Sequence, residues 1–187
     1  MKPVCLVLGA GAGIGGTVAT KFAQEGYHSS LCRRSDKEGL DRLVKNIEDQ
    51  GGSANGYIMN AIEDNAIEEV ITSIESDIGP IEVLVYNLGA QTGMKLLDQT
   101  SHKEFEWGWR MASFGLFRAA KVLCPLMLER GKGTFLVTSA TAAMRGNMNQ
   151  HSHAAAMGAR RMLCQSLNAE FSSQGIHVVH IVVDGAV

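Results

Sequence analysis

The glycine-rich stretch Gly9–Gly16 limits the possible folds of this chain more than any other feature. It directly follows the apolar run Val4–Leu8 and precedes Thr17–Gln24, where apolar residues recur at helical spacing. A strand that ends in a glycine turn and opens a helix lets the backbone approach a pyrophosphate closely and points the helix N-terminus at it. The context therefore predicts a dinucleotide site at this turn, and a tight turn without a ligand is the alternative.

Two glycine spacings overlap in this stretch. Gly11, Gly13 and Gly16 satisfy GxGxxG. Gly9, Gly13 and Gly15 satisfy GxxxGxG. Either spacing is informative only where a strand precedes it and a helix follows, and both conditions are met here. The residues expected to contact the cofactor at this turn are Gly9, Gly11, Gly13, Ile14 and Gly15.

Short apolar runs alternate with longer amphipathic segments along the whole chain, which is typical of βα units that build a parallel sheet. The length of 187 residues fits one domain. We therefore predict a single doubly wound α/β domain (Rossmann fold) over residues 1–187, with six strands and helices on both faces. Two long helices are expected over 105–127 and 154–171, and capping boxes at Ser35 with Glu38 and at Ser101 with Glu104. The predicted strands are Val4–Leu8, His28–Cys32, Gly56–Met59, Ile81–Tyr86, Thr134–Thr138 and His177–Val183.

Composition excludes several classes of partner. The net charge is −2 and basic residues are interspersed with acidic ones, so no basic stripe is available for nucleic acid or an anionic membrane. No run reaches the ~20 apolar residues of a membrane span. The cysteines lie far apart inside apolar stretches, which indicates buried thiols in a reducing compartment and predicts a cytoplasmic protein. They are Cys5, Cys32, Cys124 and Cys164.

The GxxxGxG spacing and several later segments resemble the short-chain dehydrogenases/reductases. Tyr86–Gly89 is similar to that family's Asn-Asn-Ala-Gly element, and Gly133–Ala140 is similar to the strand that leads to its catalytic serine. Ser152–Met157 and Gly175–Asp184 resemble its active-site helix and its sixth strand. The resemblance implies a nicotinamide dinucleotide as cofactor.

Residues after the second predicted strand indicate which dinucleotide is bound. Arg33 and Arg34 stand where NAD-preferring folds place an acidic residue, and guanidinium groups pair well with a 2′-phosphate, so NADP(H) is favoured over NAD(H). Two solvated arginines at a strand end are the alternative. The resemblance implies that Asn60 and Ala61 lie at the adenine. It also implies that Asn87 and Gly89 lie on the ribose and nicotinamide side.

The resemblance fails at the positions that carry the family's chemistry. His153 falls at the tyrosine that exchanges the proton, and Met157 at the lysine that lowers the pKa of this tyrosine. Ala140 falls at the serine that polarises the carbonyl, and Ala112 at the asparagine that completes a proton relay. Methionine carries no charge and alanine donates no hydrogen bond, so the usual acid–base and oxyanion assistance is lost.

Two residues could still serve catalysis. His153 could act as acid or base, since a histidine side chain ordinarily titrates near neutral pH, although a histidine on an alanine-rich helix face is often structural. Ser139 precedes Ala140 and is expected on the opposite side of its strand unless the backbone bulges. Arg161 could reach back toward Met157. The sequence places no carboxylate or cysteine near His151 and His153, so no metal site is expected.

The sequence thus leaves two functional hypotheses. The first is an NADP(H)-dependent oxidoreductase that transfers a hydride to or from a small carbonyl or alcohol of unknown identity. The second is a non-catalytic NADP(H)-binding or dimerising module. Relatives continue beyond the position of Val187 with a substrate-covering segment, so this segment is expected to be absent. Either the chain is a fragment or isoform, or it does without a conventional substrate pocket. The helices over 105–127 and 154–171 are expected to form a homo-oligomer interface, and packing in the intramolecular core is the alternative. The apolar residues expected there are Met111, Phe114, Leu116, Ala155, Met162 and Leu163.

Overall fold

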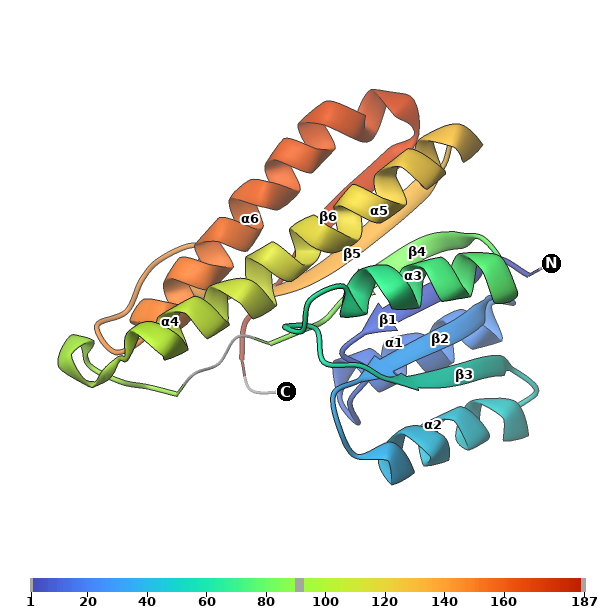
Figure 1. Ribbon diagram of the computed structural model, residues 1–187, viewed down its shortest axis with the longest axis horizontal. Coiled ribbons are helices and arrows are strands. Elements are labelled where there is room, and N and C mark those ends of the chain that lie inside the picture. The colour runs from blue at the N-terminus through green and yellow to red at the C-terminus, as the bar shows by residue number, and fades with distance from the viewer. Residues whose placement is uncertain (1, 90–92, 186–187) are drawn as a thin grey trace.

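The computed structural model describes residues 2–89 and 93–185 and contains a parallel six-stranded sheet in the order β3-β2-β1-β4-β5-β6 (Figure 1). This order reverses next to β1, which is the position where open α/β sheets bind ligands. The predicted doubly wound fold is confirmed. The strands are β1 (Val4–Leu8), β2 (His28–Arg33), β3 (Ser53–Ile58), β4 (Ile81–Tyr86), β5 (Gly133–Ala140) and β6 (Ile176–Val183).

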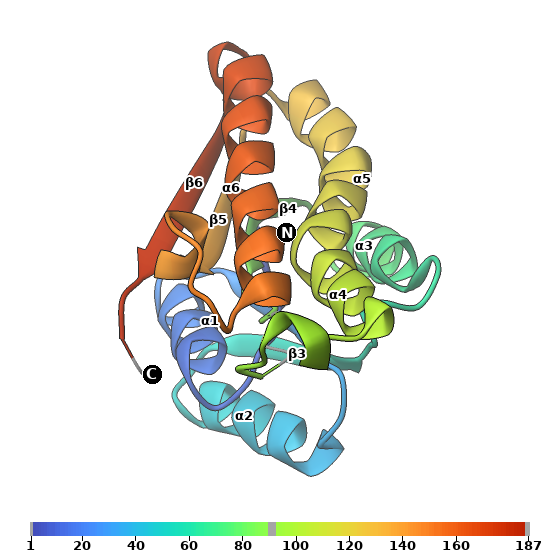
Figure 2. The same ribbon diagram turned by 90° about the vertical axis from the view of Figure 1, so that its left-hand side faces the viewer.

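Helices cover both faces of the sheet (Figures 1 and 2). One apolar cluster joins the sheet to α1 and α2, and a larger one joins it to α3, α5 and α6. Every residue of β1 is fully buried, because this central strand is covered on both faces, which explains its unbroken apolar sequence. The helices are α1 (Ile14–Gln24), α2 (Lys37–Asp49), α3 (Ala66–Asp77), α4 (His102–Trp109), α5 (Gly115–Arg130) and α6 (His151–Phe171).

The third strand begins earlier than the apolar pattern predicts. It starts at Ser53 rather than at Gly56, and Ser53 pairs with His28 of β2. The imidazole of His28 lies 2.7 Å from the Ser53 hydroxyl and 3.0 Å from the Asn55 amide oxygen. Polar cross-strand pairs of this kind extend β3, which lies at the sheet edge, beyond its apolar part.

One of the two predicted capping boxes is wrong. Asp36, and not Ser35, caps α2, and its carboxylate accepts a hydrogen bond of 2.9 Å from the amide of Gly39. Asp36 has φ 60°, a left-handed conformation that the sequence pattern did not predict. The second box is confirmed, because Ser101 and Glu104 exchange side-chain and backbone hydrogen bonds at the start of α4.

The two long predicted helices are present and extend further than expected. The π-helical segment Arg110–Phe114 joins α4 to α5. The resulting run His102–Arg130 is long and apolar enough to cross a membrane by length and composition, contrary to the expectation from the sequence. However, 56% of its most apolar window is buried inside the protein, as in a core helix. Packing against the sheet therefore accounts for its apolar composition.

The four cysteines are free and buried, as predicted. Burial raises the pKa of the Cys124 and Cys164 thiols to about 11. Burial also raises the pKa of Cys5 and Cys32 far above the usual range. These thiols therefore stay protonated near neutral pH and are poor nucleophiles.

Candidate cofactor-binding and active site

The glycines of the β1–α1 turn fall into two groups. Gly9 has φ 95°, and a Cβ there would lie 2.6 Å from the carbonyl oxygen of Asn87. A Cβ on Gly15 would lie 2.2 Å from the carbonyl oxygen of Gly9. By contrast, a Cβ on Gly11 or Gly13 would meet no described atom within 4 Å. Gly9 and Gly15 thus allow close backbone packing, whereas Gly11 and Gly13 leave an open cradle on the outside of the turn.

The N-terminus of α1 opens onto this cradle. Gly13 is the N-cap residue, and among the described residues no side chain caps the helix and no acidic residue lies in its first turn. The first amide groups of a helix lack intrahelical acceptors and carry the positive end of the helix dipole. This helix end is therefore suited to a pyrophosphate, and Ile14, its first residue, also lines the adjoining cavity.

Asn87 ties three strands together at their carboxyl ends. Its backbone amide donates to Leu8 (2.8 Å), its side-chain amide donates to Gly9 (3.0 Å), and Thr138 donates to its side-chain oxygen (2.8 Å). Both polar atoms of its side chain therefore take part in hydrogen bonds that hold the turn in place. Gly89, two residues further on, is exposed and lines the same cavity as Asn87.

The two arginines after β2 have different surroundings. Arg33 forms an ion pair of 3.1 Å with Asp36, so an acid does lie near this position. Arg34 is exposed and lines a groove together with Asn60 and Glu63. Of the two arginines, Arg34 is the one that lines this groove.

Asn60, which lines this groove, has a buried side-chain acceptor. Its amide nitrogen donates to Glu63 at 3.0 Å. Its side-chain oxygen is buried and meets no hydrogen-bond donor in the part of the chain that the structure describes. A buried acceptor of this kind costs free energy until a donor reaches it, and the exocyclic amine of an adenine is such a donor. Ala61 is buried beside it, and its carbonyl accepts from Arg118 at 3.1 Å.

The four positions at which the family's catalytic residues are replaced lie close together around α6. A cavity of about 230 Å³ is lined by Ser139, Ala140, His153 and Met157 among others. Ala112 packs against Met157 in a small cluster of alanines next to this cavity. A weakly polar sulfur and methyl groups therefore occupy positions where the resemblance implies a lysine and an asparagine.

Ser139 lies on the side of α6, contrary to the expectation from strand alternation. Its hydroxyl donates to the sulfur of Met157 at 3.6 Å. The register of β5 against β6 is regular through Ser139 and Ala140, so no bulge is needed. Ser139 therefore reaches the cavity directly, because the strand ends here and both residues border it.

Arg160 is a site residue that the sequence reasoning missed. It is 1% exposed and lines the cavity, whereas Arg161, expected to reach back, is only partly buried and does not line it. Arg160 donates to the carbonyl oxygens of Ala112 (2.9 Å), Thr138 (2.7 Å) and Leu88 (2.6 Å). The signal was present, because His153, Met157 and Arg160 follow the i, i+4, i+7 spacing of one helix face.

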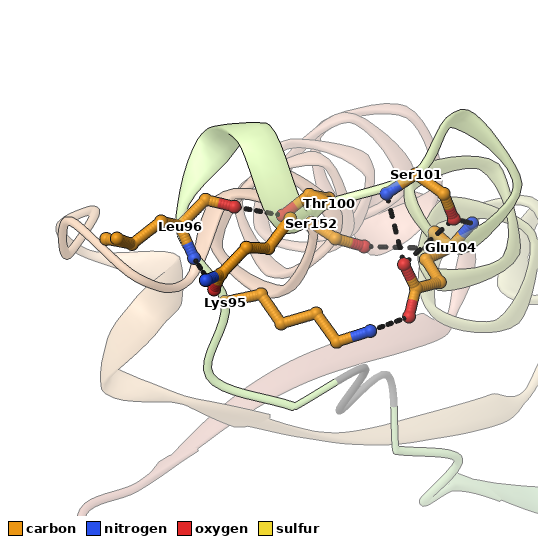
Figure 3. Close-up of polar contacts among 7 residues, drawn as sticks. Lys95, Leu96, Thr100, Ser101, Glu104 and Ser152 are labelled. Carbon is orange, nitrogen blue, oxygen red and sulfur yellow. Dashed lines mark hydrogen bonds and ion pairs between the residues drawn. The ribbon is translucent and has the colours of Figure 1, made fainter.

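A polar network joins Lys95 to the start of α4 (Figure 3). Lys95 forms an ion pair with Glu104, and Ser101 donates to the same carboxylate through its amide (3.0 Å) and its hydroxyl (2.8 Å). These hydrogen bonds, with that from Lys95 first, lower the pKa of Glu104 to about 2. Ser152 of α6 donates to the Glu104 carbonyl at 3.0 Å. The network thus connects the loop after β4 to α4 and α6 beside the cavity.

No group of three or more histidine, cysteine, aspartate or glutamate side chains suited to a metal occurs within residues 2–89 and 93–185.

His153 is 8% exposed and lines the cavity.

The fold and this site define a dinucleotide-binding α/β protein. The chain belongs to the short chain dehydrogenase family, whose sequence profile it matches over residues 3–186. It is 29% identical over 175 residues to the 3-oxoacyl-(acyl-carrier-protein) reductase FabG of Thermotoga maritima, and this match covers 94% of the chain and 70% of the reductase. It is therefore an oxidoreductase by lineage, in a family that binds a nicotinamide dinucleotide.

Solved structures agree with this assignment. A short-chain dehydrogenase from Rhodopseudomonas palustris is 30% identical and superposes with a TM-score of 0.89, covering 96% of this chain and 84% of that one. A gluconate 5-dehydrogenase from Burkholderia cenocepacia J2315, in complex with NADP and tartrate, shares the fold with a TM-score of 0.88 at 24% identity, covering 98% of this chain and 72% of that one. The open cradle at Gly11 and Gly13 and the unpaired acceptor of Asn60 fit the cofactor of this family.

Proposed function

We propose that this chain binds NADP(H) across the β1–α1 turn and slowly transfers a hydride between this cofactor and a small carbonyl or alcohol. The observation that carries the proposal is the cradle at Gly11 and Gly13, which opens beside the cavity that holds His153 and Ser139. The backbone of the cradle and the N-terminus of α1 would hold the pyrophosphate. Asn60 would accept a hydrogen bond from the adenine.

Arg34 supports the preference for NADP(H). Its side chain is exposed at the groove that contains Asn60, and a guanidinium binds phosphate oxygens in a bidentate fashion. Arg33 would contribute through its positive charge, which Asp36 partly offsets.

The residues around the cavity suggest a reduced set of catalytic roles. When bound, the nicotinamide supplies or accepts the hydride. The imidazole of His153 would exchange the proton with the substrate oxygen. The hydroxyl of Ser139, now on the weakly accepting sulfur of Met157, can turn to donate to that oxygen at little cost. Met157 leaves the family's lysine position uncharged, so general acid–base assistance, typically ~10²–10⁴-fold, is incomplete.

Turnover with NADPH and a set of small aldehydes and ketones, followed by nicotinamide absorbance, tests this proposal. We expect a slow reaction that follows one ionisation near neutral pH and is lost in His153→Phe. His151→Phe is the matched control and should retain the wild-type rate, because His151 does not line the cavity. Fast reduction that persists in His153→Phe would show that the active site lies elsewhere.

A non-catalytic NADP(H)-binding module is the second candidate. The cluster of Ala112, Ala142, Ala143, Ala156 and Met157 favours it, because methyl groups and a thioether replace the polar relay. Tight NADPH binding without turnover of any carbonyl tested, in wild type and in Met157→Lys, would support this second candidate against the first.

We further propose that the protein is cytoplasmic and self-associates through α4–α5 and α6. The residues that support self-association are partly different from those expected. Met111 and Leu116 belong to the core, at 6% and 0% exposure. The exposed apolar side chains are instead Phe105, Trp109, Phe117 and Met162.

A further inference from the structure

The guanidinium of Arg160 is a buried cation held by neutral groups. Its three hydrogen bonds go to main-chain carbonyl oxygens at the ends of β4 and β5 and in the π-helical segment. Its charge also lies 5.2 Å from the centre of the Tyr86 ring. Within the described residues, no carboxylate lies within ion-pair distance of Arg160. Carbonyl dipoles and a ring face thus stabilise this charge without neutralising it.

Other arginines below the surface of this protein have acidic partners. Arg118 forms a bidentate pair with Glu68, and Arg130 forms one with Glu75. Pairing with an acid is the usual condition for burying an arginine, because an isolated buried charge is costly. Arg160 departs from this pattern at the site where the family's lysine is missing.

The titratable groups around Arg160 do not offset its charge near neutral pH. Burial raises the pKa of Tyr86 far above its usual range, and burial raises that of Cys164 to about 11, so both are neutral. Burial, with the charges of Arg160 and Arg161, lowers the pKa of His180, which is also neutral. Arginine itself stays protonated in proteins even where burial lowers its pKa, as it does here. Arg160 therefore remains a fixed positive charge beside the cavity.

This charge borders the place where the cofactor's ring would lie. Arg160 lines the same cavity as Ile14 of the glycine turn and as Asn87 and Gly89. A charge shielded from water acts on its neighbours with little screening by salt. The two redox states of the cofactor differ in the charge of the nicotinamide ring, because the oxidised ring is cationic and the reduced ring is neutral.

We propose that Arg160 makes this site bind the reduced dinucleotide more tightly than the oxidised one. The inference rests on the proposed function, since it requires the nicotinamide ring to enter this cavity. Arg160 thus determines redox-state specificity and replaces the family's lysine as the fixed positive charge. The preference raises the midpoint potential of the bound cofactor by ~30 mV for each tenfold difference in affinity, so bound NADPH is a weaker hydride donor than free NADPH and the equilibrium on the enzyme shifts toward oxidation of an alcohol.

Calorimetric titration with NADPH and with NADP⁺ tests this proposal. For the wild type we expect NADPH to bind at least ~10-fold more tightly. Arg160→Gln should bring the two affinities close together, and Arg160→Lys should keep most of the difference because it keeps the charge. Arg161→Gln is the matched control and should behave as the wild type. Equal affinities in the wild type, or an unchanged ratio in a folded Arg160→Gln, would overturn the inference.

A measurement without any variant covers the case in which Arg160→Gln does not fold. Raising the salt concentration should weaken both cofactors through their phosphates and leave the wild-type affinity ratio unchanged, because the Arg160 charge is buried. An affinity ratio that falls toward one at high salt would contradict the proposal.

Titration with 2′-phospho-ADP-ribose, which lacks the nicotinamide, distinguishes failure of the inference about Arg160 from failure of the proposed function. If this probe binds but NADPH and NADP⁺ bind equally, the inference alone fails, and if none of the three binds, the proposed function fails with it.

Discussion

At the scale of single residues, the glycines of the β1–α1 turn lack side chains for two different reasons. Gly15 packs against the carbonyl oxygen of Gly9, where a methyl group would lie 2.2 Å away. A methyl group on Gly11 would enter open space. The first glycine serves the fold and the second leaves room for a ligand.

This difference predicts opposite outcomes for two alanine substitutions. Gly15→Ala should destabilise the protein by ~1–3 kcal/mol through overpacking, as measured by urea unfolding. Gly11→Ala should change the free energy of unfolding by less than ~1 kcal/mol yet weaken NADPH binding by at least ~10-fold, because the methyl group fills the cradle. Unchanged NADPH affinity in Gly11→Ala would show that the pyrophosphate does not bind at this position.

Some site residues could be predicted from the sequence because their spacing is local. The glycine spacing predicted the β1–α1 turn. The resemblance to the family predicted cavity residues such as His153. Arg160 was missed because a charged residue on a helix is usually solvated, and only the convergence of three carbonyls from distant segments makes its burial favourable. The left-handed conformation of Asp36 was likewise not encoded in any local pattern.

At the scale of elements, the start of α4 is held by a network that also includes Lys95 (Figure 3). Ser101 and Glu104 form the predicted capping box, and Lys95 approaches the same carboxylate from the loop. The box was predictable because its residues are three apart. The contribution of Lys95 depends on the tertiary path of the loop and was not.

The capping box predicts specific losses of stability. Ser101→Ala should cost ~1 kcal/mol in urea unfolding, because the helix loses its N-cap acceptor. Ser35→Ala is the matched control and should have little effect, because Asp36 caps α2. Equal losses in the two variants would contradict the assignment of the caps.

The low pKa of Glu104 predicts how this stability depends on pH. The folded pKa is about 2 and the reference value is 4.5, so the carboxylate stabilises the fold above pH 4.5 and loses this contribution as pH falls toward 2. The difference in stability between wild type and Glu104→Gln should therefore shrink across this window. A difference that stays constant from pH 6 to pH 2.5 would contradict the assigned pKa.

At the scale of the whole molecule, the six-stranded parallel sheet and both helical layers followed from the alternation of apolar runs and amphipathic segments, whereas the strand order did not. The order places the carboxyl ends of β1 and β4 side by side, and these ends carry the glycine turn and Asn87. The division of apolar residues between core and surface did not follow from the sequence. Met111 and Leu116 are as apolar as Phe117, and only the packed structure shows that they are buried and Phe117 is exposed.

The exposed apolar side chains on α4–α5 and α6 predict self-association. Sedimentation at micromolar concentration should give a dimer or larger species for the wild type and mainly monomer for Phe117→Glu. Ile58→Glu is the matched control, because Ile58 is similarly exposed, at 49% against 46% for Phe117, but lies on the edge strand β3. A wild type that sediments only as a monomer would rule out this interface.

The most direct test of the central claim is a calorimetric comparison of NADPH and NADH at one ionic strength. We predict that NADPH binds at least ~10-fold more tightly and that Arg34→Gln removes most of the difference, because the guanidinium contacts the 2′-phosphate. Equal affinities, tighter binding of NADH, or no binding of either cofactor would contradict it.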